Sequence, residues 1–399
     1  MINKLSTWLL ASLCLVSQQA GAQAQYPDSL LSMKRIFSQG AAEAMGEPFQ
    51  GVHTSAGLQT GLFPVQTTGV STAPVVAAAN AFLATLDPME LSRSHFAVDD
   101  PEWRNWSNVD VGIFARHGIS LEEMDAAQKE AAWDLLRASL SARGLNLTRN
   151  IMRTEQALLD LNEDMIRYGE EKYYFTLMGL PSTTEPWGWQ LDGHHLVINY
   201  FVLGDQIVMT PAFWGGEPVF TESGKYAGNV ILQEEQDQGL AFMQALDAGQ
   251  RSRATLSPDK VRNDQLAAAN QDNLVLDYEG IPGSELTGVQ RQHLLELIGL
   301  YVGNMTEPQA RVHLSDIAQH LDSTWFAWIG GVDPDAVFYY RVHSPVILIE
   351  FDHQNPVGTL QKNPAGTPTR DHIHTVVRTP NGNDYGKDLL RQHLLEHPH

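Results

Sequence analysis

Two short histidine clusters are the groups in this sequence best suited to carry chemistry. His194-His195 precedes the apolar stretch 196–200, and His372-Ile373-His374 opens a second stretch rich in β-branched residues. In a β-strand alternate residues share one face, so the rings of His372 and His374 are predicted to point the same way, one pleat repeat apart. This spacing allows both imidazoles to reach one metal ion.

Acidic side chains lie close to these histidines in the predicted strand order. Glu350 and Asp352 share one face of the segment 346–353, and the residues of this segment that precede Glu350 are all apolar. A buried carboxylate needs a cation or a metal as partner. An ordinary cross-strand ion pair between Glu350 and Arg378 is the competing explanation. We predict metal ligands among five residues, with His194 facing inward only if Gly193 introduces a bulge: His194, His195, Glu350, His372 and His374.

Three imidazoles and a carboxylate, without sulfur, suit a divalent zinc ion, and also copper, iron or manganese. The plainest function is a hydrolase in which the metal lowers the pKa of a bound water. Glu350 is then the fourth ligand or the general base, Arg378 steadies developing negative charge and Asn199 orients the substrate. A copper or iron oxidoreductase would use the same ligands. Two further hypotheses stay open, namely a non-catalytic extracytoplasmic binding protein and histidines that only hydrogen-bond buried backbone.

The strands that carry these groups belong to an internal repeat. The segment 174–179 (YFTLMG) resembles the segment 325–330 (WFAWIG), and the same offset aligns Asn199 with Glu350. Each strand segment follows a helical pattern, of which the first begins at Ser120 with a capping box. We predict an α+β fold over residues 61–399. One large domain contains two pseudo-symmetric helix-plus-β-hairpin halves, about 120–216 and 285–386, with helices packed around antiparallel strands.

The N-terminus has the pattern of a secretory signal peptide. Lys4 supplies positive charge, residues 5–16 are apolar and residues 20–22 (AGA) offer a cleavage site, so we assign residues 1–22 to the signal. A polar segment, 23–60, follows. The single cysteine, Cys14, lies within the signal, and an exported chain would therefore have no disulfide, thiolate nucleophile or cysteine-ligated metal. We predict a secreted or periplasmic protein.

Composition narrows the range of partners. The 399 residues include 47 acidic and 26 basic side chains, for a formal net charge of −21. A nucleic-acid partner is disfavoured because phosphate binding needs a basic surface. Beyond residue 30 no apolar run approaches the roughly 20 residues that span a bilayer. The predicted partner is a small-molecule or extracellular substrate.

Six motifs spread over most of the chain give it a family resemblance. They are RNW at 104–106, PWGWQLDGHH at 186–195, TPAFWG at 210–215, IEFD at 349–352, HIHTV at 372–376 and DYGKDLL at 384–390. Through these segments the chain resembles a family of secreted bacterial and fungal proteins known as domain of unknown function 3500. The resemblance implies a single unit and no particular activity.

Overall fold

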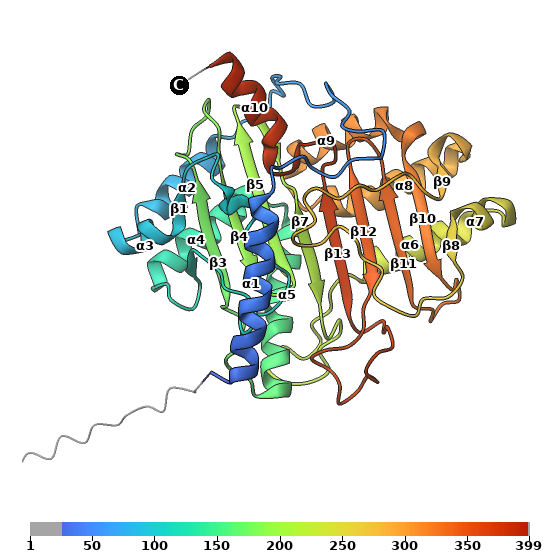
Figure 1. The fold of residues 1–399 in the computed structure, drawn as a ribbon, viewed down its shortest axis with the longest axis horizontal. Helices are drawn as coiled ribbons and strands as arrows, with labels where there is room; N and C mark the ends of the chain where they lie inside the picture. Colours follow the sequence, from blue (N-terminus) through green and yellow to red (C-terminus); the bar gives the residue numbers. More distant parts are fainter. Residues whose placement is uncertain (1–25, 398–399) are drawn as a thin grey trace, which may run out of the picture.

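One mixed sheet organises the fold, which we describe from a computed structural model covering residues 26–397 (Figure 1). The predicted signal peptide and Cys14 lie outside these described residues. The 13-stranded sheet has the order β1-β3-β4-β5-β7-β13-β12-β11-β10-β8, with β2 on β3, β6 on β5 and β9 on β10. Neighbouring strands are antiparallel except β1–β3 and β10–β8, near the two edges of the sheet. The predicted α+β class with antiparallel strands is confirmed at this level.

The elements alternate between short helical groups and strand groups along the chain. The strands are β1 (His95–Phe96), β2 (Ile119–Ser120), β3 (Tyr173–Met178), β4 (Trp187–Gly193), β5 (Leu196–Leu203), β6 (Gln206–Val208), β7 (Ala212–Gly216), β8 (Thr255–Ser257), β9 (Ile281–Pro282), β10 (Trp325–Gly330), β11 (Phe338–His343), β12 (Leu348–His353) and β13 (Ile373–Arg378). The helices are α1 (Asp28–Gly46), α2 (Ala73–Leu83), α3 (Pro88–Ser94), α4 (Ala126–Ser139), α5 (Ala142–Asn162), α6 (Gln233–Ala245), α7 (Ala248–Ala254), α8 (Gly288–Val302), α9 (Glu307–Gln319) and α10 (Lys387–Glu396).

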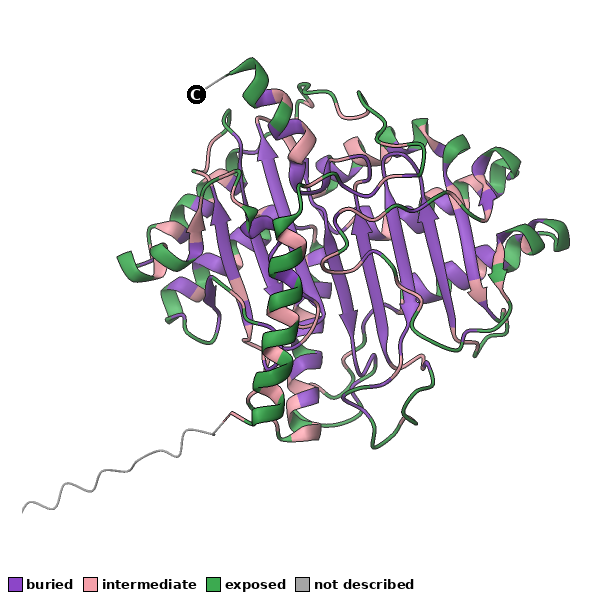
Figure 2. Ribbon diagram, viewed as in Figure 1, coloured by how far each residue is buried: buried purple, intermediate pink, exposed green. Residues whose placement is uncertain are grey.

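Both faces of the sheet are covered, and the core strands are buried from end to end (Figure 2). Helices α2, α4, α5, α6, α8 and α9 pack their apolar stripes on one face and form the larger core cluster with it. The opposite face carries a smaller cluster built from loops, with Trp103, Trp106 and Tyr385 among its members. Burial on both faces explains the continuous apolar runs of the central strands.

The first helix of the repeat region begins later than predicted. Ser120 and Glu123 do exchange the reciprocal hydrogen bonds of a capping box, but these close only a turn. Asp125 and Gln128 form a second capping box, and α4 starts from it at Ala126. Two adjacent boxes compete for one helix start, and the one followed by uninterrupted helix formers determines it.

The predicted polar segment before residue 60 contains a long helix, α1. It crosses the loop-covered face and is mostly exposed, with Ala41 its buried residue (Figures 1 and 2). Polar bonds hold it in place: Lys34 Nζ donates to the Val111 carbonyl at 2.9 Å, and Arg104 donates to the Ala44 carbonyl at 2.7 Å. A helix that buries so little apolar surface leaves a weak hydrophobic period in the sequence.

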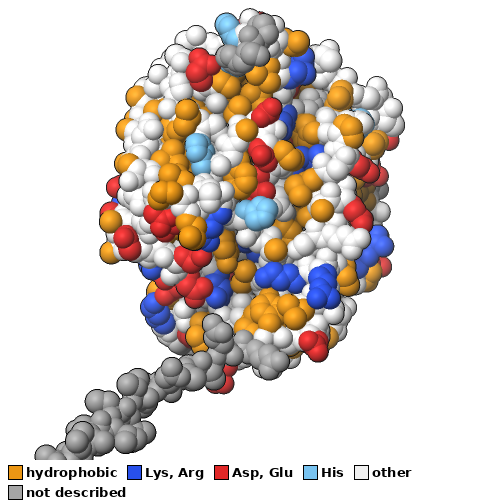
Figure 3. Space-filling model, turned by 60° about the vertical axis from the view of Figure 1, so that its left-hand side comes forward, with side chains coloured by type: hydrophobic (Ala, Val, Ile, Leu, Met, Phe, Trp, Pro, Cys, Tyr) orange, Lys and Arg blue, Asp and Glu red, His pale blue; other side chains and the backbone are white. Residues whose placement is uncertain are grey.

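One face of the molecule shows how its charged side chains are distributed (Figure 3). On the face shown in Figure 3, lysine and arginine side chains are scattered among acidic and apolar ones and form no continuous stripe. Within residues 26–397, every helix is either too short or too polar to cross a bilayer.

His343, at the end of β11, provides a test of how the burial of a histidine changes the stability of the fold at acid pH. Its side chain packs against Tyr278 with ring centroids 4.6 Å apart and is almost wholly buried. Burial, reinforced by Arg341, lowers the pKa of His343 to about 3. The unfolded chain, with a histidine pKa near 6.5, therefore binds a proton first as the pH falls. Stability from this site is present above about pH 6.5 and is lost on the way down to pH 3.

We expect His343→Phe to be less sensitive to acid than the native chain. The slope of unfolding free energy against pH between pH 6 and pH 4 should decrease by up to about 1.4 kcal/mol per pH unit, which corresponds to one proton. Urea unfolding followed by tryptophan fluorescence at several pH values measures that slope. An unchanged slope would show that His343 is charged in the folded protein.

Candidate metal centre

Three histidines from two distant parts of the sequence meet at one end of the sheet. His195 lies in the turn between β4 and β5, His372 directly precedes β13, and His374 is the second residue of β13. Strand β7 joins the two regions because Trp214 pairs with Leu196 on one side and with a β13 residue on the other. As predicted, the structure brings these three residues together, and they form a group that could hold a metal ion.

The nitrogen atoms of the three rings are spaced as metal ligands are. The Nε2 atom of His372 lies 3.0 Å from Nε2 of His374 and 3.3 Å from Nε2 of His195. In tetrahedral zinc sites the metal–nitrogen distance of 2.0–2.1 Å places two ligand nitrogens about 3.3 Å apart. The two distances from His372 therefore match the spacing of ligands in a coordination tetrahedron, and one ligand atom from each of the three residues lies within 4.8 Å of the others.

A hydrogen bond on the far side of the His372 ring determines which of its nitrogens carries the proton. Nδ1 of His372 lies 2.7 Å from the Asn355 carbonyl oxygen, which can only accept, so this Nδ1 is protonated. Nδ1 of His195 faces the carboxylate of Glu155 at 3.4 Å. With its proton on Nδ1, the His372 ring turns a bare Nε2 lone pair toward Nε2 of His195 and of His374. That lone pair is satisfied either by an N–H of the His195 or His374 ring, 3.3 and 3.0 Å away, or by a cation bound between the rings.

Burial makes a proton a poor choice for that cation. Desolvation, aided by the neighbouring His194 ring, lowers the pKa of His195 to about 3. Burial and then the rings of His372 and His195 hold the pKa of His374 well below its usual range. A group of neutral imidazoles in a buried site is the protonation state that metal binding requires.

The backbone at His195 is held in an unfavourable conformation. Its φ is 60°, in the left-handed region that glycine or asparagine normally occupies at this position of a tight turn. A histidine there costs on the order of 1 kcal/mol, and such costs concentrate at functional sites. The turn aims the ring at the strand-end pair His372 and His374 instead of along the strand face.

Glu155 of α5 forms a second group with His194 and His195. Its carboxylate lies 2.9 Å from Nδ1 of His194, whose ring stacks on that of His195 with centroids 3.8 Å apart. Burial raises the pKa of Glu155 to about 7, and the nearby His195 ring opposes that rise. Carboxylates placed behind a ligand histidine orient the ring and increase its basicity. His194, predicted as a ligand, belongs to this supporting group and not to the group of three.

Glu350, predicted as the fourth ligand or base, belongs to neither group among the described residues. Its carboxylate accepts hydrogen bonds from Tyr339 Oη at 2.6 Å and from the backbone N–H of Ala267 at 2.7 Å and of Leu266 at 3.0 Å. These bonds anchor the loop that follows β8 to the sheet. The predicted need of a buried carboxylate for a partner is met by this loop, and not by a metal or by Arg378.

Arg378 and Asn199, predicted to act on substrate, direct their polar atoms into the protein. Arg378 is fully buried and donates to Asp272 at 2.9 Å and to Asp384 at 3.0 Å. Asn199 Nδ2 donates to the Pro211 carbonyl at 2.8 Å, and its oxygen accepts from Gln190 at 2.7 Å. Both side chains have their hydrogen-bonding capacity used by structural partners, so we assign them positions in the core.

Sequence reasoning missed Glu155, and a signal for it exists. The apolar stripe of α5 contains Ile151, Met152 and Leu158, and Glu155 lies within that stripe at helical spacing. A lone glutamate on a buried helix face is rare unless it has a partner. The Asn355 carbonyl left no signal, since any residue type supplies it.

Comparison with known proteins gives a family and no activity. A family described as "Protein of unknown function (DUF3500)" matches residues 68–387, a range that contains all of the histidines and carboxylates above. No curated protein and no solved structure matches the chain.

Proposed function

The chain belongs to the DUF3500 family, whose description names no activity, and we propose from its own residues that it is a metal-dependent enzyme, most plainly a hydrolase. One observation carries the proposal: the Nε2 atoms of His195, His372 and His374 converge with spacings of 3.0 and 3.3 Å. Three histidines on one ion leave a fourth position for water or substrate, as in catalytic zinc sites.

Each residue of the site has a distinct part in this proposal. The three histidines bind the ion, whose contribution when bound is to acidify a water molecule or to polarise a carbonyl or phosphoryl group. Glu155 holds the His195 ring from behind, and the Asn355 carbonyl does the same for His372. His194 retains 15% side-chain exposure, and His374 is the most exposed of the three proposed ligands at 9%.

We expect Glu155→Gln to weaken zinc binding about 10- to 100-fold, because it removes the charge that fixes the His195 ring. Competition against a chromophoric chelator measures the affinity. Glu350→Gln is the matched control, since Glu350 is also a fully buried carboxylate but serves the loop at Ala267. Its zinc affinity should stay within about threefold of the native value. Equal losses in the two variants would mean that general destabilisation, and not ring positioning, is being measured.

A catalytic metal site keeps its fourth coordination position open, whereas a storage site fills it with a protein ligand. Cobalt(II) substituted for the native ion reports this position through its visible spectrum. We expect azide to change the spectrum and to inhibit hydrolysis of an activated ester. A spectrum that ignores azide indicates a closed shell and favours the non-catalytic metal-binding alternative, to which the depth of His195 (2% exposed) lends weight. Copper or iron found in the native protein would favour the oxidoreductase alternative.

We also propose that the body consists of two copies of one helix-plus-hairpin unit. Strand registers support this reading: Phe175 pairs with Leu191 in β3–β4, and Phe326 pairs with Val342 in β10–β11, with the same separation. The short strands β2 and β9 attach to Phe175 and Phe326 in the same way. The metal-binding group then lies beside the β7–β13 pairing that joins the copies.

We place the function outside the cytoplasm, in the periplasm or the medium, with a small-molecule or extracellular substrate. The predicted signal at residues 1–22 supports this location, as does a mature chain free of cysteine. Intact mass of the exported protein tests it: the chain should begin near residue 23, and an intact N-terminus would contradict export.

A further inference from the structure

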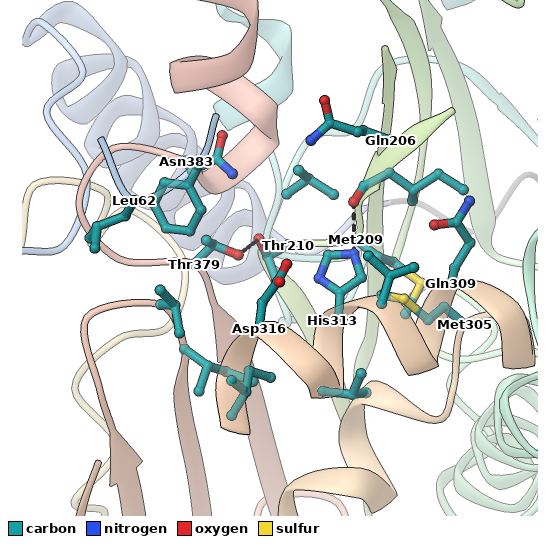
Figure 4. Close-up of a pocket in the computed structure, with 18 of the residues that line it drawn as sticks. Leu62, Gln206, Met209, Thr210, Met305, Gln309, His313, Asp316, Thr379 and Asn383 are labelled. Atoms are coloured by element: carbon teal, nitrogen blue, oxygen red, sulfur yellow. Dashed lines mark hydrogen bonds between the residues drawn. The ribbon is translucent and has the colours of Figure 1, made fainter. Parts of the chain in front are cut away.

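A separate cavity of about 400 Å³ lies on the helix-covered face of the sheet (Figure 4). Helix α9 forms one wall, the ends of β6 and β13 form another, and the segment around Leu62 closes it. Its inner lining is apolar and includes Met209, Trp214, Met305 and Val377. Both its size and this lining fall within the range of small-molecule sites.

Two buried polar atoms in the lining have no partner among the described residues. They are Nε1 of Trp214 and Oε1 of Gln309, on side chains that are 1% and 2% exposed. The other end of the Gln309 amide is used, since Nε2 donates to the Asp205 carbonyl at 3.3 Å. In Figure 4 the Gln309 oxygen is turned toward the cavity. An unsatisfied buried donor or acceptor costs about 1–3 kcal/mol, so a ligand or water that bonded these two atoms would remove that cost.

His313 supplies a further acceptor. Its Nε2 donates to the Ile207 carbonyl at 2.8 Å, and burial lowers the pKa of the ring, which leaves a bare lone pair on Nδ1. The hydroxyls of Thr210 and Thr379 bond each other at 2.7 Å on the opposite wall. The cavity thus offers one indole donor, two acceptors and a hydroxyl pair.

The charged residues that line the cavity favour one sign of charge on a ligand. Asp316, an exposed residue of α9, is the only charged side chain among the described residues that line the cavity. No lysine or arginine of the described chain lines it. A carboxylate or phosphate inside would meet Asp316 without a compensating cation, whereas an ammonium group would be attracted.

We propose that this cavity binds a small primary amine with an apolar body that carries a hydroxyl group. The body packs between Met209 and Met305, the hydroxyl accepts from Trp214 and donates to Gln309, and the ammonium group lies at Asp316. The site is independent of the metal centre. Trp214 and Val377 belong to the helix-side core, while Phe213, whose ring contacts His374, belongs to the cluster on the other face.

Calorimetric titration with three matched probes tests this assignment. Tyramine carries all three features, phenethylamine lacks the hydroxyl, and 3-(4-hydroxyphenyl)propionate replaces the ammonium by a carboxylate. We expect tyramine to bind, phenethylamine to bind about 3- to 10-fold more weakly, and the carboxylate at least 10-fold more weakly. Equal affinity for the amine and the carboxylate, or no tyramine binding at 10 mM, would overturn the proposal.

Three variants of α9 test where tyramine binds and what holds its ammonium group. Val312→Trp fills the half-buried lining and should abolish tyramine binding, whereas Ala318→Trp, on the exposed side, should leave it unchanged. Asp316→Asn should weaken tyramine about 2- to 5-fold and leave phenethylamine and the carboxylate closer in affinity. Zinc affinity should be native in all three variants, so failure here is distinguishable from failure of the metal site. Tyramine binding that survives Val312→Trp would contradict the location.

Discussion

Replacing His372 and His374 together by alanine is expected to abolish tight metal binding, with a loss of at least about 10³-fold in zinc affinity. Two of three ligand nitrogens disappear, and each contributes a large part of the roughly 10–16 kcal/mol typical of zinc bound by protein side chains. The fold should survive, since both residues lie at the start of β13, at the end of the sheet. Competition with a chelator measures the affinity in the native and variant chains.

Thermal unfolding provides the control for that result. Zinc should raise the melting temperature of the native protein, because it binds the folded state, and should not raise that of the double variant. His343→Ala removes another buried histidine from the end of a strand but is expected to keep the zinc response. A double variant that binds zinc as tightly as the native chain would exclude these residues as ligands.

The second large effect is on stability, at Arg378. We expect Arg378→Met to destabilise the folded protein by about 3–5 kcal/mol, because it leaves Asp384 buried without its cation and removes one of the two arginines that pair with Asp272. Burial alone would raise the pKa of Asp272, yet the guanidinium groups of Arg378 and Arg104 lower it on balance. The Arg378 side chain also donates to the Ala267 carbonyl at 2.7 Å, and this bond attaches the loop that follows β8 to the sheet.

An exposed ion pair is the matched control for Arg378. Arg137 of α4 pairs with Glu130 and Asp134 at the surface, and Arg137→Met should change stability by no more than about 0.5 kcal/mol. Urea unfolding compares the two variants. If Arg378→Met unfolds like the native chain but loses hydrolysis, the arginine acts in catalysis and its structural assignment is wrong.

The group of three histidines could be predicted from sequence because its signals are local. His372 and His374 are separated by one residue, so they share a face of their strand because side chains alternate. His195 follows a strand whose residues align with those of the second hairpin. The α+β class followed from the same strand and helix periods. Nothing in those periods shows that β7 lies between β5 and β13, and this adjacency brings His195 to the other two.

Errors arose where partners come from loops or from another layer. Strand alternation correctly places Glu350 on a buried face. Its partners, however, are Tyr339 and the backbone of Leu266 and Ala267. The sequence of a loop has no periodic pattern that predicts where the loop packs. Glu155 comes from a helix packed across the sheet end, a contact that only the tertiary fold creates. Helix α1 is held by polar bonds such as Lys34 to Val111, and these leave no hydrophobic pattern.

Anomalous diffraction from crystals of native protein, purified without a metal-affinity column and grown with zinc, tests the metal centre most directly. The predicted result is one peak at the zinc edge, about 2.0–2.1 Å from Nε2 of each of His195, His372 and His374, with a fourth position outside the protein ligands. No peak at these atoms, or a peak between Glu155 and His194 instead, would contradict the proposed site.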